Sequence, residues 1–206
     1  MSVEEVPTLE YLVTMATHVP EGTPEEAVQE IRTRGAGRSR QLTARGHLLR
    51  LWRPPLQTGE WRTLGLFAAD DGDQLEKVLA SMPLRVWRTG KATPLAPHPN
   101  DPGLTARDTG TEILTTFAIT IPEGTATTTV DDIEAREAER AKELTGQGHL
   151  RRLWKLPDQP SAPGLWNARD PAEMRATLTS LPLDPWMMVE TTPLSMHPND
   201  PATTRP

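Results

Sequence analysis

The sequence predicts an α+β protein made of two tandem copies of one domain-sized unit. GHLLRLW at residues 46–52 returns as GHLRRLW at 148–154, and TPLAPHPNDP at 93–102 returns as TPLSMHPNDP at 192–201. The repeated motifs keep their order and lie about 100 residues apart, which is the size of a small domain and too long for a solenoid repeat. The elements can therefore be predicted for one copy and checked against the other.

Each copy begins with a predicted strand, a turn and a long helix. A β-prone run stops at a Pro-Glu-Gly-Thr turn, and apolar side chains then recur at helical spacing. Gly46 and Gly148 end the two helices, as glycine in left-handed geometry commonly does. The predicted ranges are 10–19 and 24–44 in the first copy, and 112–121 and 127–145 in the second.

The rest of each copy reads as two strands, a second helix and a final strand. The HLLRLW and HLRRLW runs form strands that end at Pro, and Pro171 suits the first turn of a helix. The complete order is βαββαβ, the ferredoxin-like arrangement of a four-stranded antiparallel sheet with two helices on one face. The predicted ranges are 47–52, 61–68, 73–81 and 86–95, and in the second copy 149–154, 162–168, 171–180 and 186–194.

These elements predict two units joined by a linker. The units cover residues 8–96 and 111–198, and the Pro-, Gly- and Asp-rich segment 97–110 is the linker. The face of each sheet that carries no helix also needs a cover, and the other copy's sheet is the simplest one. We therefore expect an intramolecular pseudo-dimer, an α/β barrel or sandwich with a cavity between the sheets.

Composition and charge limit the class of protein. The chain has 206 residues, 36% of them apolar, no Cys and a net charge of −6. The acidic start and the lack of about 18 consecutive apolar residues argue against a signal peptide and a membrane span, so we expect a cytoplasmic protein without membrane contact. Nucleic acid is not an expected partner, because phosphate binding needs a basic face. The arginine-rich run 32–45 favours a solvated helix face over an anion site.

The second copy resembles the muconolactone Δ-isomerase family. GHLRRLWKLP and SLPLDPWMMVETTPLSMHP are similar to the family patterns G-x-W-R-H-L-W-R and L-P-L-F-P-Y-M-D-I-E-V-x-P-L-x-x-H-P. The resemblance implies proton transfer along an unsaturated lactone, and dimers of ferredoxin-like units that assemble further; fusion would replace the dimer here, with a further homo-oligomer possible. Arg50 and Arg152 stand where the family has His, Trp186 and Met188 where it has Tyr and Asp, and Glu190 where it has Glu.

Strand parity predicts which side chains face the cavity. Side chains alternate across a strand, so a Trp and a charged residue two positions apart share a face. An apolar, Trp-lined pocket with a few charges suits a small hydrophobic substrate that contains a carbonyl group. The residues predicted to face the cavity are Leu48, Arg50, Trp52, Trp87, Thr89 and Lys91, then Arg152, Trp154, Trp186, Met188 and Glu190, and Leu12, Thr14, Ala16 and His18 with Leu114, Thr116, Ala118 and Thr120.

A catalytic role can be predicted for the charged residues. Glu190 would remove a C–H proton α or γ to a carbonyl, and Arg50 or Arg152 would stabilise the enolate oxygen. His18 is a second acid/base candidate, because the other copy has Thr120 there. Alternatively, Glu190 forms a structural ion pair with one of these arginines or with Lys91. Substrate contacts are expected from Trp52, Trp154, Trp87, Trp186, Lys91 and Met188.

Three functions remain open at this point. The first is an isomerase or cyclase that transfers a proton on an unsaturated lactone or a polyketide-like biosynthetic intermediate. The second is a catabolic muconolactone Δ-isomerase, and the third is a protein that binds a hydrophobic ligand without turnover. No motif such as H-E-x-x-H or a Gly-rich phosphate loop occurs, so we expect no metal and no cofactor.

Overall fold

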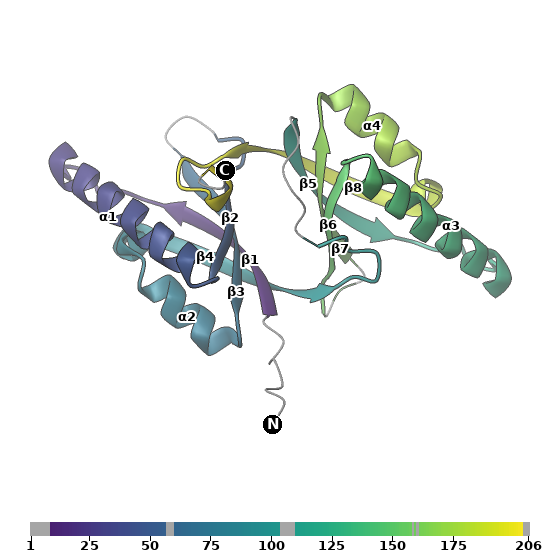
Figure 1. Cartoon of the computed structure of the whole chain (residues 1–206), viewed down its shortest axis with the longest axis horizontal. Coiled ribbons are helices and arrows are strands. Elements are labelled where there is room, and N and C mark those ends of the chain that lie inside the picture. The colour runs from purple at the N-terminus through teal and green to yellow at the C-terminus, as the bar shows by residue number, and fades with distance from the viewer. Residues whose placement is uncertain (1–8, 57–59, 104–109, 158, 160, 204–206) are drawn as a thin grey trace. The chain divides into compact units, whose positions relative to one another are not determined.

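The computed structural model describes residues 9–56, 60–103, 110–157, 159 and 161–203 (Figure 1). Residue 8 and residues 104–109 of the predicted linker lie outside this part of the chain. The described residues form two compact units: those within 1–95 and 195–203 make the first, and those within 96–194 make the second. The first unit therefore takes its last segment from the C-terminal end of the second copy.

The first unit has the predicted order of elements. Its strands and helices are β1 Leu9–Thr17, α1 Glu25–Ala44, β2 Leu48–Arg53, β3 Trp61–Ala69, α2 Gly72–Ala80 and β4 Arg88–Pro97, with a 3-10 turn at Pro83–Trp87. The strands are antiparallel: β1 lies between β4 and β3, and β2 pairs with β3. The last two residues of β8, Ser195 and Met196, pair with Arg53 and Trp52 at the outer edge of β2.

The helices of the first unit cover one face of this sheet (Figure 1). Tyr11, Val13 and Met15 of β1 pack in one apolar core with Leu42 of α1 and Leu75 of α2. Since side chains alternate along a strand, Leu12, Thr14 and Ala16 lie on the opposite face. Gly46 ends the helical segment with a positive φ of 75°, as the sequence predicts.

The second unit repeats this arrangement. Its elements are β5 Thr111–Ile119, α3 Thr127–Gly146, β6 Leu150–Lys155, β7 Ser161–Ala168, α4 Pro171–Thr179 and β8 Met187–Met196, with a 3-10 turn at Asp184–Trp186. Ile113 and Phe117 of β5 share an apolar core with Leu144 of α3 and Met174 of α4. The last two residues of β4, Ala96 and Pro97, pair with Lys155 and Trp154 of β6. The predicted α+β class and the two tandem ferredoxin-like units are confirmed.

Two details of the strands differ from the predictions. A bulge interrupts β2 between Leu48 and Arg50, and another interrupts β6 between Leu150 and Arg152. Because a bulge adds a residue, Leu48 faces the helices and packs in the same core as Leu51, so its predicted place beside Arg50 was wrong. Trp87 and Trp186 end 3-10 turns, and the last strands begin one residue later.

Candidate functional site

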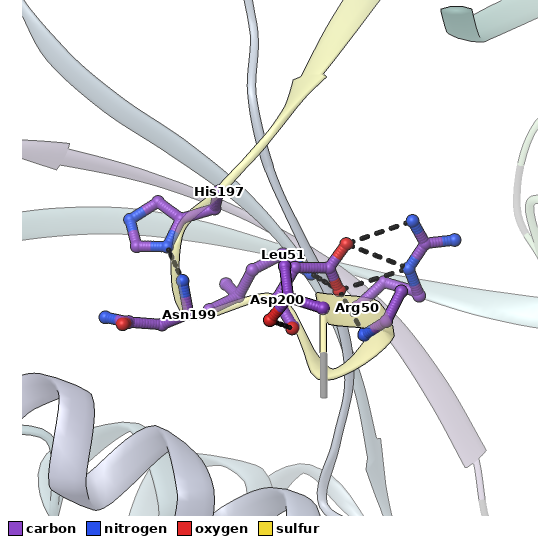
Figure 2. A network of polar contacts seen from close by, with 7 residues as sticks. Arg50, Leu51, His197, Asn199 and Asp200 are labelled. Atoms are coloured by element: carbon purple, nitrogen blue, oxygen red, sulfur yellow. Dashed lines mark hydrogen bonds and ion pairs between the residues drawn. The ribbon is translucent and has the colours of Figure 1, made fainter. Parts of the chain in front are cut away.

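Arg50 forms a buried ion pair in the first unit. Its Nε donates to Asp200 Oδ1 at 3.1 Å and Oδ2 at 3.2 Å, and Nη2 donates to Oδ2 at 3.0 Å (Figure 2). The backbone N–H of Leu51 donates to the same carboxylate at 3.1 Å. Asp200 is only 1% exposed, and the Arg50 guanidinium carbon lies 4.8 Å from the centroid of the Trp52 ring. These contacts attach the C-terminal segment to β2.

Arg152 makes the equivalent ion pair in the second unit. Its Nε donates to Asp101 Oδ1 at 3.0 Å and Oδ2 at 3.1 Å, and the backbone N–H of Leu153 donates to Oδ1 at 2.9 Å. The Arg152 guanidinium carbon lies 4.6 Å from the centroid of the Trp154 ring. Asp101 therefore attaches the end of the first copy to β6, as Asp200 attaches the end of the second copy to β2.

The histidines of the two HPNDP motifs fix the turns that carry these aspartates. Nδ1 of His197 accepts the backbone N–H of Asn199 at 3.1 Å (Figure 2), and Nδ1 of His98 accepts that of Asn100 at 3.1 Å. Burial lowers the pKa of His197 to about 4, and the charge of Arg53 acts in the same direction. His197 is therefore neutral at pH 7 with its proton on Nε2, since Nδ1 is an acceptor.

Glu190 and Lys91 occupy matching positions on the last strands. Glu190 pairs in register with Thr116, and Lys91 with Thr14. Both lie on the helix-free face of their own sheet and both are exposed. Met188 shares the face of Glu190 and is 76% exposed.

The other predicted residues lie at two kinds of position. Trp52 and Trp154 are 1% and 2% exposed, so each packs as a buried platform for its arginine. His18 is exposed just beyond β1, where its backbone N–H donates to the carbonyl of Trp87 at 2.7 Å. The strand-parity argument does not apply to Trp87 and Trp186, because they precede the strands.

A large pocket lies on the helix side of the first unit's sheet. Its volume is about 840 Å³. It is bounded by α1 and by the sheet end at which β1 and β2 stop and β3 and β4 start. Its lining includes Met15, Arg32, Gly35, Ala36, Arg40, Leu51, Arg53, Glu60, Trp61, Arg62, Met82, Arg88 and His197. This pocket is on the face opposite to the one that parity predicts for a cavity.

Arginine dominates the charge of this pocket. Five of these lining residues are arginines, and Glu60 is the one carboxylate among the described lining residues. Glu60 Oε1 accepts from Arg62 Nη2 at 3.1 Å. The Arg32 guanidinium carbon lies 4.2 Å from the centroid of the Trp61 ring. The pocket thus combines a carboxylate, an aromatic wall and an excess of positive charge.

Arg88 is the most enclosed cation of the pocket. Its Nη1 donates to the sulfur atoms of Met15 at 3.1 Å and Met82 at 3.4 Å, and Nη2 donates to the carbonyl of Leu79 at 3.1 Å. Desolvation by burial lowers the pKa of Arg88. A guanidinium nevertheless stays protonated in a protein, so a positive charge is held here among neutral groups.

The second unit has different residues at the corresponding positions. Glu137 stands on α3 where α1 has Gly35, and its Oε2 accepts the backbone N–H of Leu183 at 3.0 Å. Met187 stands where the first unit has Arg88, and it packs against the apolar core. The two copies have therefore diverged at this place.

Comparison with known proteins identifies the family. Residues 9–101 and 112–200 each match the family model of muconolactone Δ-isomerase. The chain belongs to the muconolactone Δ-isomerase family. This confirms the resemblance and the duplication, because each copy matches the family model on its own.

Curated members of the muconolactone Δ-isomerase family have the length of one copy. Muconolactone Δ-isomerase 1 of Acinetobacter lwoffii is 31% identical over 81 residues, which are 39% of this chain and 84% of that protein. Muconolactone Δ-isomerase of Cupriavidus pinatubonensis is 28% identical over 81 residues, 39% of this chain and 88% of that protein. The relatives of this chain are thus isomerases.

A solved structure matches nearly the whole chain. A heme-binding protein from Thermus thermophilus has a TM-score of 0.62 at 11% identity, covering 94% of this chain and 95% of that one. At this identity the likeness shows a shared fold.

Among the helices of the described residues, none is both long and apolar enough to cross a membrane.

Sequence reasoning missed the aspartates and most of the pocket. Asp101 and Asp200 could have been noticed, because HPNDP is repeated without change although it follows the last strand of each copy. Arg32 and Arg40 are exposed on α1, as the sequence favoured, but their place at the edge of the pocket was not foreseen. The signal for Arg88 was its replacement by Met187 in the second copy.

Proposed function

We propose that this protein is an isomerase that transfers a proton along an unsaturated lactone or a polyketide-like intermediate, in the pocket of the first unit. The observation that carries the proposal is that Glu60 shares a pocket of about 840 Å³ with five arginines, of which Arg62 contacts its carboxylate. Proton transfer next to a carbonyl needs a base and a stabilised enolate oxygen, which side chains alone can supply. Membership of an isomerase family supports the reaction class.

Glu60 acts as the base in this proposal. Its carboxylate removes a proton from the carbon γ to the carbonyl, and the electron pair moves through the double bond to form a dienolate. The arginines of the pocket stabilise the enolate oxygen, and Arg62 holds Glu60 at 3.1 Å. Glu60 then returns the proton to the α carbon, so the double bond has moved and the base is regenerated.

Glu190 remains the alternative base. It is exposed on the helix-free face of the second unit's sheet, with Met188 on the same face. We propose a structural role for Arg50 and Arg152, which their ion pairs with Asp200 and Asp101 support.

Solvent deuterium exchange followed by NMR tests the proposal. The substrate panel contains muconolactone, other unsaturated lactones and cyclisable polyketide-like ketones. We expect the wild-type protein to exchange a substrate proton, Glu60→Gln to lose exchange by about 100-fold or more, and Glu76→Gln, an exposed control on α2, to match wild type.

The other outcomes separate the remaining hypotheses. Loss of exchange only in Glu190→Gln would overturn the pocket site and return the base to the sheet face. Conversion of muconolactone itself would support the catabolic enzyme. Binding without exchange in every variant would indicate a ligand-binding protein.

A further inference from the structure

We infer that the pocket of the first unit binds an elongated ligand that carries one anionic group at each end and an apolar middle, held between Arg88 and Arg53. The inference deepens the proposed function, because it states the charge and shape of the ligand. It concerns binding, so it can be tested without turnover.

Arg88 supplies the first anionic subsite. Its guanidinium donates to two methionine sulfur atoms and one carbonyl, so its charge meets only neutral acceptors among the described residues. Enclosing a charge without a counter-ion is unfavourable, and a bound carboxylate or other anion would compensate it. A guanidinium also offers two parallel N–H groups, which match the two oxygens of a carboxylate.

Arg53 supplies the second subsite near the opposite edge of the sheet, on the same face as Arg88. The register places Arg88 of β4 beside Thr17 of β1, and Thr17 beside Trp61 of β3. Trp52 of β2 pairs with Leu64 of β3. Arg53, the next residue of β2, therefore lies one strand further from β4 and at the same end of the sheet as Arg88. Three strand spacings of about 4.8 Å separate the backbones of β4 and β2, which is about 14 Å.

Apolar and small side chains line part of the space between the two cations, and the Arg32 guanidinium lies over the Trp61 ring there. Trp61, Met15 and Leu51 line it on the sheet side, and Gly35 and Ala36 line it on the α1 side. Nothing lies within 4 Å of where a Cβ on Gly35 would be, so the small residues leave room above the sheet. Cavities of this size hold ligands larger than a simple lactone.

The second unit indicates that Arg88 is not required by the fold. Met187 takes its place there and packs with the core, and Glu137 takes the place of Gly35. Methionine fills the same position in the second unit, so packing does not require an arginine there. A bound anion is a simpler reason for Arg88. The second unit also suggests Arg88→Met as the substitution for the test, because methionine fits at this position.

Calorimetry with two matched probes tests the inference. The probes are naphthalene-2,6-dicarboxylate and 2-naphthoate, which share a ring system and differ by one carboxylate. We expect the dicarboxylate to bind about tenfold more tightly or better, because each charged hydrogen-bonding group contributes at least that factor. Arg88→Met and Arg53→Met should each reduce dicarboxylate affinity about tenfold, to the level of the monocarboxylate.

The controls keep the test decisive. Arg136→Met removes an exposed arginine from α3 and should leave affinity unchanged. Arg88→Lys keeps a charge and should retain part of the affinity even if Arg88→Met is unstable, while Gly35→Glu should abolish binding by filling the space. Equal affinity for the two probes, or equal losses in Arg136→Met and Arg88→Met, would overturn the inference.

The inference and the proposed function can fail separately. If the dicarboxylate binds as expected but no substrate exchanges deuterium, the binding site stands and the isomerase proposal fails. If uncharged lactones exchange and the dicarboxylate does not bind, the isomerase stands and the two-anion site fails.

Discussion

Asp200 and Asp101 are single residues near segment ends, but each satisfies one buried arginine and one backbone N–H. Asp200 accepts from Arg50 and Leu51, and Asp101 accepts from Arg152 and Leu153. A buried bidentate ion pair adds little to the free energy of unfolding compared with apolar residues of the same volume. Removal of one partner, however, leaves an uncompensated buried charge, which is strongly destabilising. The aspartates therefore matter more to stability than their position in the sequence indicates.

Asp200→Ala is expected to destabilise the first unit by about 3–5 kcal/mol, because the Arg50 charge would stay buried without its partner. Chemical denaturation followed by Trp fluorescence measures the change. Asp101→Ala is the matched variant in the second unit and should cost somewhat less, since its carboxylate side chain is 14% exposed against 0% for Asp200.

The double variant Arg50→Met with Asp200→Leu is the control for this prediction. It removes both charges and keeps an apolar contact, so it should recover most of the lost stability. If the double variant is as unstable as Asp200→Ala, the shape of the turn rather than the ion pair holds the segment.

At the scale of elements, the sequence predicts the order and approximate limits of the strands and helices. Gly46 and Gly148 have the positive φ values of 75° and 80° that were expected at helix ends. The bulges in β2 and β6 could not be predicted, because HLLRLW alternates equally well with or without one extra residue. The 3-10 turns at Trp87 and Trp186 were missed for a similar reason, since a Trp after a turn suits a strand.

The candidate site was less predictable than the elements. The register places Glu190 opposite Thr116 and Lys91 opposite Thr14, but parity cannot show which aspartate an arginine meets. The pocket depends on how α1 lies on the sheet, which the sequence does not show. The importance of the small residues of α1 becomes clear only when α1 is compared with α3. Gly35 becomes informative once Glu137 is seen at the matching position.

Glu137 couples α3 to the turn after α4 and should make the second unit sensitive to pH. Desolvation raises its pKa, while the N–H of Leu183 acts in the opposite direction. A carboxyl with a raised folded pKa stabilises the fold at low pH, and this contribution is lost as the pH rises through the folded pKa. Glu137→Gln keeps the acceptor for Leu183 and removes the charge.

We expect Glu137→Gln to raise the thermal midpoint at pH 7, with a gain that shrinks toward pH 4. Calorimetry across this range measures it, and Glu139→Gln, an exposed change on the same helix, is the control. A lower midpoint at pH 7 would mean that the charge itself stabilises α3.

At the scale of the whole molecule, each compact unit is completed by a segment from the other copy. The first unit includes the described residues from Ser195 onward, and the second begins at Ala96. Deletion of residues 197–206 should therefore weaken the first unit, although those residues follow the second copy in sequence. Amide hydrogen exchange should increase in β2, and β5 should remain as protected as in the intact chain.

Asp101→Ala provides the mirror-image control, because it should increase exchange in β6 while β2 keeps its protection. If the deletion instead loosens β8 and β5 first, the tail stabilises the copy to which it is joined.

The two units also differ in when their parts leave the ribosome. The second unit is one continuous stretch, Ala96–Leu194, and its Asp101 is made before its Arg152. The first unit is made earlier but needs Asp200, which follows the whole second unit in sequence, before the ion pair with Arg50 can form. We therefore expect the first unit to complete its fold after the second, although it is synthesised first. During synthesis the outer edge of β2 stays unpaired until Ser195 and Met196 are made, whereas the second unit already has all of its strands.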